Sequence, residues 1–122
     1  MHVTRLLAVA LVAGGCASAG GGIFPEAGEP VAALSRAEAL IQDAERAGAD
    51  SLAAEAMAAA RRNVTEAQVA QRGRDGNRAA LFAREAQADA IYAKAAAERA
   101  RADRARTDAD AALKALPPGG AR

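Results

Sequence analysis

The sequence predicts an all-α fold: an antiparallel three-helix bundle, or a helical hairpin with a long protruding third helix, after a signal peptide and a flexible tether. Alanine occupies 39 of the 122 positions, and alanine has the highest helix propensity of all residues. Aromatic residues make up only 2% of the chain, and β-branched residues are scarce, which excludes a β-sandwich or barrel. At 52% hydrophobic residues, the chain is also too apolar for a solvated disordered protein.

Residues 1–15 have the features of a secretory signal peptide. Arg5 supplies a positive charge, and the apolar run from Leu6 to Ala13 is too short to span a bilayer as a permanent helix. Because this segment ends in small residues followed by Cys16, it resembles a bacterial lipobox. The resemblance implies cleavage between Gly15 and Cys16, acylation of Cys16 by lipid chains such as palmitate, and a stable anchor in the membrane. The alternatives are an ordinary secreted protein with an unpaired cysteine and a cytosolic protein with an apolar start.

The mature chain divides into three parts. Residues 16–30 contain the lipidated cysteine and a tether rich in Gly, Ala and Pro, which reaches roughly 45 Å at most when extended. Residues 31–116 form the Ala-rich helical domain, and residues 117–122 form a disordered tail. Ala17, directly after the cysteine, favours sorting to the outer membrane over retention in the inner membrane.

The first two helices are predicted from apolar residues at helical spacing. The first begins after Pro30 and ends at Gly48, which suits a left-handed position after a helix. The second covers about 52–72, with Asp50 or Ser51 as its cap. Short connections make neighbouring helices antiparallel. The predicted core positions are Val31, Leu34, Ala37, Ile41, Ala44 and Gly48 in the first helix, and Leu52, Ala56 or Met57, Ala60, Val64 and Ala67 in the second.

The third helix is predicted from about 78 to 116, between the turn at 73–77 and Pro117. Thirty-nine helical residues are about 58 Å long, so this helix extends several turns beyond the second helix, which is about 31 Å long. Phe82 and Ala86 extend the apolar surface at the start of this helix, and the overshoot is either a solvated rod or half of a seam between helices. The predicted apolar stripe is Leu81, Ala88, Tyr92 with Ile91 beside it, Ala95, Ala102, Ala109, Leu113 and Leu116.

Three runs of residues resemble the bacterial family called domain of unknown function 4398. They are Arg36–Gly48, Ser51–Arg62 and Gly76–Ala90, in which alanine recurs at helical spacing around acidic and basic residues. The resemblance covers about residues 31–105. It implies a short Ala-rich helical protein of the bacterial envelope, and it implies no activity and no site residues.

The residue types argue against a catalytic or metal site. His2 and Cys16 are the only histidine and cysteine, so a His/Cys metal site or a His-based triad is excluded. Glu85 and Asp89 form an i,i+4 carboxylate pair, for which a solvated face is the favoured interpretation, and Tyr92 is expected to pack in the bundle. We therefore expect no enzyme activity and no cofactor.

Partners are expected in the envelope. Sixteen basic and 15 acidic residues nearly balance, so nothing suggests nucleic-acid binding. A basic patch lies near the second turn and could contact lipid or glycan phosphates, but ordinary solvation is the favoured interpretation. The patch comprises Arg72, Arg74, Arg78 and Arg84. The overshoot at 99–116 is the candidate partner-binding or self-associating segment, with Arg99, Arg101, Arg104, Arg106 and Leu113 as its contact residues.

The expected function is that of a non-catalytic outer-membrane lipoprotein on the periplasmic side, acting as a helical adaptor or scaffold. Its partners are the membrane, through the lipid on Cys16, and an envelope protein or itself. One alternative is a self-assembling structural lipoprotein of the murein type. That family ends in a lysine linked to peptidoglycan, whereas this chain ends in Arg122, and no peptidoglycan-binding motif is present. The other alternative is an activator subunit of an envelope enzyme.

Overall fold

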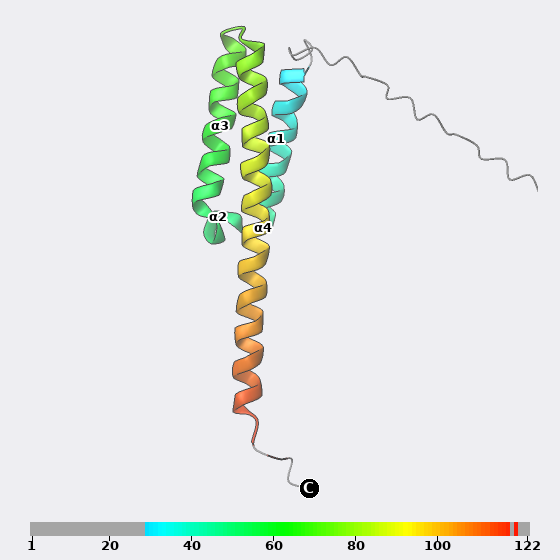
Figure 1. The fold of residues 1–122 in the computed structure, drawn as a ribbon, viewed down its shortest axis with the longest axis vertical. Helices are drawn as coiled ribbons and strands as arrows, with labels where there is room; N and C mark the ends of the chain where they lie inside the picture. The colour runs from blue at the N-terminus through cyan, green and yellow to red at the C-terminus, as the bar shows by residue number, and fades with distance from the viewer. Residues whose placement is uncertain (1–28, 118, 120–122) are drawn as a thin grey trace, which may run out of the picture.

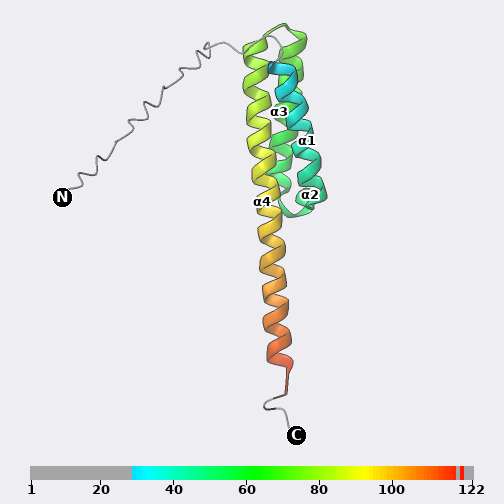
Figure 2. The same ribbon diagram turned by 90° about the vertical axis from the view of Figure 1, so that its right-hand side faces the viewer.

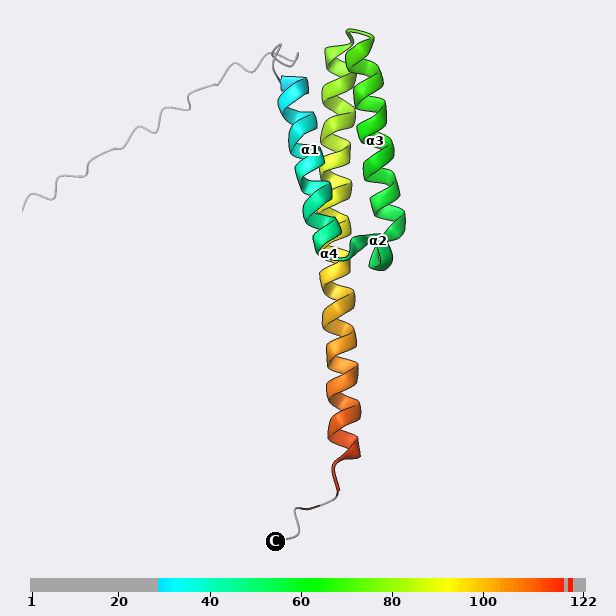
Figure 3. The same ribbon diagram turned by 180° about the vertical axis from the view of Figure 1, so that it is seen from behind.

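The structure, a computed structural model, describes residues 29–117 and 119, and this part of the chain is helical without strands. Three long helices lie side by side: α1 (Glu29–Arg46), α3 (Ala54–Arg72) and α4 (Gly76–Ala115), with the single turn α2 (Ala49–Leu52) between α1 and α3. The helix α3 runs antiparallel to α1 and α4, and α4 continues alone beyond the bundle (Figures 1 and 3). The predicted all-α class is confirmed, in the form of a three-helix bundle with a protruding last helix.

The first turn confirms one prediction and corrects another. Gly48 has φ 80°, the left-handed conformation expected for it, because a glycine has no Cβ to clash there. The predicted cap is wrong: the Ser51 hydroxyl donates to the carbonyl of Gly48 at 3.2 Å, and the Asp50 carboxylate pairs with Arg61 at 2.7 Å. The backbone N–H groups of Ser51 and Leu52 also point to the Gly48 carbonyl. The chain therefore makes the extra turn α2 before α3 begins.

The second turn joins α3 to α4 through Arg74. The N–H of Asp75 donates to the carbonyl of Ala70 at 2.9 Å and that of Arg74 to Gln71 at 3.0 Å, a pair of bonds that closes the end of α3. The Asp75 carboxylate accepts from the N–H of Arg78 at 3.0 Å and caps α4. The left-handed residue of this turn is Arg74, at φ 61°, although glycines stand on either side of the turn.

The core face of α4 consists of alanines, and the predicted stripe is wrong as a core face beside the other helices. Leu81 is 55% exposed and Tyr92 68%, and Ala88 and Ala95 are exposed as well. On the overshoot, the stripe residues Ala102, Ala109, Leu113 and Leu116 are exposed, as expected for a segment outside the bundle. Of the two residues predicted to extend the stripe at its start, Ala86 is buried and Phe82 is partly buried. A face made of methyl groups lets helix axes approach more closely than a face of leucines does, so α1 and α3 pack against the alanines. The buried residues of α4 are Ala79, Ala80, Ala83, Ala86, Ala90, Ala93 and Ala97.

The core faces of α1 and α3 were predicted more accurately. Ala37, Ile41 and Ala44 are buried in α1, but Val31 is wrong, since it is 52% exposed while Pro30 and Ala33 take the inner positions. The buried residues of α3 are Met57, Ala60, Ala67 and Ala70, whereas Leu52, Ala56 and Val64 are partly buried at the edge of the core.

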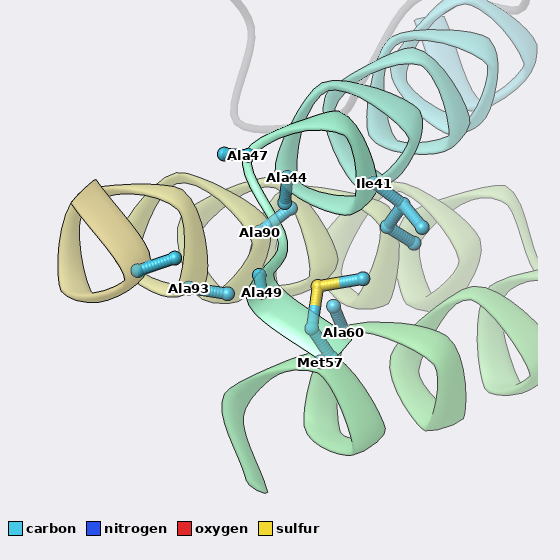
Figure 4. Packing of buried hydrophobic residues seen from close by; sticks show 9 residues of the cluster. Ile41, Ala44, Ala47, Ala49, Met57, Ala60, Ala90 and Ala93 are labelled. Carbon is cyan, nitrogen blue, oxygen red and sulfur yellow. The ribbon is translucent and has the colours of Figure 1, made fainter. Parts of the chain in front are cut away.

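Met57 is the large side chain at the centre of this core. It is fully buried and extends from α3 toward Ile41 on α1, with Ala90 and Ala93 of α4 alongside (Figure 4). No polar or charged residue is buried in the described part of the chain. The bundle is therefore held together by small apolar contacts around one long side chain.

The last part of α4 has no neighbouring helix. Ala97 is its last buried residue, and every residue from Arg101 to Pro117 is exposed. The 18 residues from Glu98 to Ala115 form a rod of about 27 Å. Figure 2 shows this rod continuing the axis of α4 past the turn formed by α2. The predicted overshoot of the third helix is confirmed.

Candidate functional site

Exposed apolar side chains form a line along α4, which we call the outer stripe. They lie on the surface that α1 and α3 leave uncovered, both beside the bundle and on the rod. The large members are exposed by 55–68%, whereas the alanines that face α1 and α3 are almost completely buried. The outer stripe comprises Leu81, Ala88, Ile91, Tyr92, Ala95, Ala102, Ala105, Ala109, Ala112, Leu113 and Leu116.

The five predicted contact residues all lie on the rod and are exposed. Leu113 belongs to the outer stripe, and the four arginines are spread around the rod instead of forming one cluster. Arg99 lies 3.9 Å from the carboxylate of Asp103. Arg101 lies against Gly48, where a Cβ would come within 2.7 Å of its Nη2 atom. The structure thus brings Arg101 back to the bundle.

Sequence reasoning missed part of the outer stripe. Ala105 and Ala112 were not identified, and Ile91 was taken only as a neighbour of Tyr92. The signal for them is the alternation of three- and four-residue steps that links Ile91, Ala95, Ala102, Ala105, Ala109, Ala112 and Leu116. This alternation is typical of a seam between two helices.

An open groove lies between the start of α3 and α4, beside the outer stripe. Leu52, Ala59, Tyr92 and Ala96 are among its lining residues. Asp89 lies at its edge, and its carboxylate accepts a hydrogen bond from the side-chain amide of Asn63 at 2.8 Å. Tyr92 was expected to pack in the bundle, but it contributes to this open surface with 68% of its area exposed. Glu55 and Arg62 also line the groove, so it continues the exposed surface of α4 with a mixed polar and apolar lining.

Arg61 ties α1, α2 and α3 together. Its guanidinium donates to the carboxylates of Glu45 and Asp50, each at 2.7 Å. The hydrogen bond to Glu45 is the largest cause that raises the pKa of Arg61 above its ordinary value, and the hydrogen bond to Asp50 is the next largest. All three side chains are about half exposed, so water screens the attraction and the gain in stability is small.

The basic patch near the second turn is partly neutralised. Arg78 lies 3.6 Å from the carboxylate of Glu66 and 5.4 Å from the ring centre of Phe82. Arg84 forms an ion pair with Glu29. These contacts fasten α4 to α3 and to the start of α1, which is a structural role for two of the four predicted arginines.

The described residues contain no group of three His, Cys, Asp or Glu side chains that could hold a metal ion. The predicted lipidation and cleavage residues, Gly15 and Cys16, lie outside the described residues. Among the helices described, none is both long enough and apolar enough to cross a membrane.

Comparisons with family models, curated proteins and solved structures found no match to this chain. The resemblance to domain of unknown function 4398 therefore stays a hypothesis.

Proposed function

We propose that this chain is a non-catalytic scaffold of the bacterial envelope, held at the periplasmic side of the outer membrane by a lipid on Cys16. The observation that supports it best is the rod of α4. Residues 102–115 project from the bundle without any helix beside them, and exposed Leu113 and Leu116 lie at the end of the rod. A helix that is surrounded by water gains little stability from packing. We therefore infer that the apolar side chains of the rod make a contact outside the bundle.

The residue types support a role without catalysis. The single histidine and the single cysteine lie at positions 2 and 16, in or next to the segment that resembles a lipoprotein signal. The interior of the bundle is lined with methyl groups, and the ionised side chains of the described residues lie at the surface, several of them in ion pairs. Such a body can hold a partner in place, whereas acid–base or nucleophilic chemistry needs groups brought together in a shielded site.

The anchor is tested by replacing Cys16 with serine in the full chain and separating membrane from soluble fractions. We expect the native chain in the outer-membrane fraction and the Cys16→Ser variant in the soluble fraction, because the acyl chains are the anchor. A variant that still fractionates with the outer membrane would refute lipid anchoring at Cys16.

The contact role of the rod is tested by truncation after Ala97, the last buried residue of α4. The shortened chain keeps every fully buried residue of α4 and loses the contact of Arg101 with Gly48. We therefore expect native-like helicity per residue together with loss of cross-linking to partners in intact cells. A chain ending at Leu116 is the matched control, since it loses only the residues beyond the helix. Unchanged cross-linking after the Ala97 truncation would eliminate the rod as the contact segment.

A further inference from the structure

We propose that the outer stripe of α4 binds the outer stripe of a second copy of this chain, with the two α4 helices antiparallel. This inference deepens the proposed function and rests on it only in taking α4 as the contact surface. It does not depend on the lipid anchor.

The distribution of large side chains along the outer stripe points to this arrangement. Ile91 and Tyr92 lie at one end of the segment, Leu113 and Leu116 lie at the other, and alanines occupy most stripe positions between them. All four large side chains are more than half exposed. An antiparallel partner brings the large residues of one end against those of the other end.

One register pairs the large side chains at both ends of the outer stripe at the same time. When Ile91 is placed against Leu116 of the second copy, Tyr92 comes beside Leu113 of the second copy, and Ala95 lies against Ala112 of the second copy. The steps of three and four residues keep this seam continuous over about seven helical turns, as in a two-stranded coiled coil. The alanines between allow the two helices to approach closely.

Charge favours the antiparallel direction. In this register Glu98, the acidic residue that interrupts the stripe, lies beside Arg106 of the second copy. Asp108 of the second copy lies on the side of Arg101, whose guanidinium lies against Gly48 in the single chain and would have to turn toward that carboxylate. Arg99 also comes near that Arg106, but Glu98 and Asp103, which already pairs with Arg99, offset the repulsion. Opposite charges at flanking positions select partner and direction in paired helices.

A parallel pairing in register brings together side chains of like charge. It places Arg101 beside Arg106 of the second copy and Lys94 beside Arg99 of the second copy. Like-charge pairs at these flanking positions disfavour the arrangement. The same sequence therefore favours one direction and opposes the other.

The bundle leaves room for the second helix. The helices α1 and α3 pack against the opposite face of α4, at Ala83, Ala86, Ala90, Ala93 and Ala97. In all three ribbon views the rod stands clear of the other helices (Figures 1, 2 and 3). A second α4 can therefore be added without displacing any element of the bundle.

Directional cross-linking in the full 122-residue chain tests the inference. Cys16→Ser removes the native thiol, and Ala95→Cys or Ala112→Cys then supplies the single thiol of each chain. Paired helices lie about 8–10 Å apart, within reach of a short bis-maleimide reagent. In the antiparallel register, two copies of residue 95 are about 26 Å apart along the helix axis, which is out of reach.

We expect a cross-linked dimer when the two chains are mixed and none when either chain is treated alone. Cross-linking of Ala95→Cys chains with themselves would show a parallel pair and overturn the inference. Absence of cross-links in every mixture would also overturn it, because the surface would then bind another protein or nothing.

A second pair of variants checks that the outer stripe carries the association. Ile91→Glu puts a charge into the seam, and we expect it to weaken self-association by at least about tenfold. Val69→Glu is the matched control, because Val69 is a similar β-branched residue, 48% exposed on α3 and outside the stripe. Equal effects of both substitutions on sedimentation, with helicity unchanged, would contradict the assignment of the stripe.

The two proposals fail separately. A native chain that stays soluble in cell fractionation while the mixed cysteine variants still cross-link refutes the anchor and leaves the antiparallel pair standing. A membrane-bound chain without any cross-link refutes the pair and leaves an anchored scaffold for a different protein.

Discussion

Replacing Met57 with alanine should remove a large share of the stability of this protein. Met57 is the largest fully buried side chain of the described residues, and it lies where α1, α3 and α4 meet, against Ile41 and a ring of alanines. The alanines around it are too short to move into the space that Met57→Ala would leave. The substitution therefore combines lost burial with a persistent cavity.

The magnitude follows from the atoms removed. Met57→Ala deletes three heavy atoms, and at about 0.8 kcal/mol for each buried methylene the transfer loss is about 2.4 kcal/mol. The cavity brings the total to about 3 kcal/mol, within the range found for such core truncations. A body of this size has roughly 4–13 kcal/mol of folding free energy. The melting temperature should consequently fall by about 12–24 °C.

Thermal and urea unfolding followed by helical circular dichroism measure this loss. Protein concentration must be fixed, because self-association adds to apparent stability. Met57→Leu is the volume-matched control and should cost less than about 1.5 kcal/mol, and Val69→Ala is the exposed control. A loss under about 1 kcal/mol for Met57→Ala would refute the central role of this side chain.

The remaining predictions concern the turns and one ion-pair cluster. Arg74→Gly should stabilise the chain by about 1 kcal/mol in urea unfolding, because the left-handed φ of 61° is strained for any residue with a Cβ. A loss of stability would contradict the assignment of backbone strain to Arg74. Gly48→Ala should destabilise by about 1–2 kcal/mol and should lower the melting temperature. Arg61→Ala should cost less than about 1 kcal/mol, since its partners are solvated. The pKa of Arg61 is raised, so its contribution is present throughout the neutral range and is lost only in strongly alkaline solution; the difference in unfolding free energy between wild type and Arg61→Ala should therefore stay constant from roughly pH 6 to 9.

The sequence was sufficient to predict the helices, because alanine content and glycine positions act locally. The third long helix was expected over about 78–116 and is Gly76–Ala115. Gly48 was assigned the left-handed conformation that it adopts. The break at Ala53 was not predicted, since no glycine or proline marks it; the chain bends there because the Gly48 carbonyl holds the turn before it.

The positions of the large side chains in the sequence do not predict which face of α4 packs against α1 and α3. The spacing of large residues predicts that Leu81 and Tyr92 face the bundle, and both are exposed. Two stripes run along α4, one made only of alanine and one that carries the larger residues. Choosing between them depends on how closely three helices approach, which is a property of the assembled bundle. For the same reason the outer stripe beside the bundle was not predicted as an exposed surface, whereas its end at Leu113 was predicted on the overshoot.

The length of the third helix predicted the location of the candidate site, whereas the residue types predicted its contact residues less well. The overshoot was expected because 39 helical residues exceed the length of a shorter neighbour, and the rod is present in the structure. Which residues of the rod make contacts depends on which face a partner covers. The four arginines predicted as contact residues are spread around the rod, and Leu113 is the member of the predicted set that lies within the outer stripe.

Sedimentation equilibrium of the Cys16→Ser chain and of the same chain truncated after Ala97, each over a range of concentrations with helicity followed on the same samples, tests the account most directly. We predict a helical dimer for the longer chain and a helical monomer for the truncated one, because the truncation removes residues 98–116, which form most of the seam. A helical monomer for the longer chain at every concentration would contradict the antiparallel pair, and a dimer that survives truncation would contradict the assignment of the contact surface to the rod of α4.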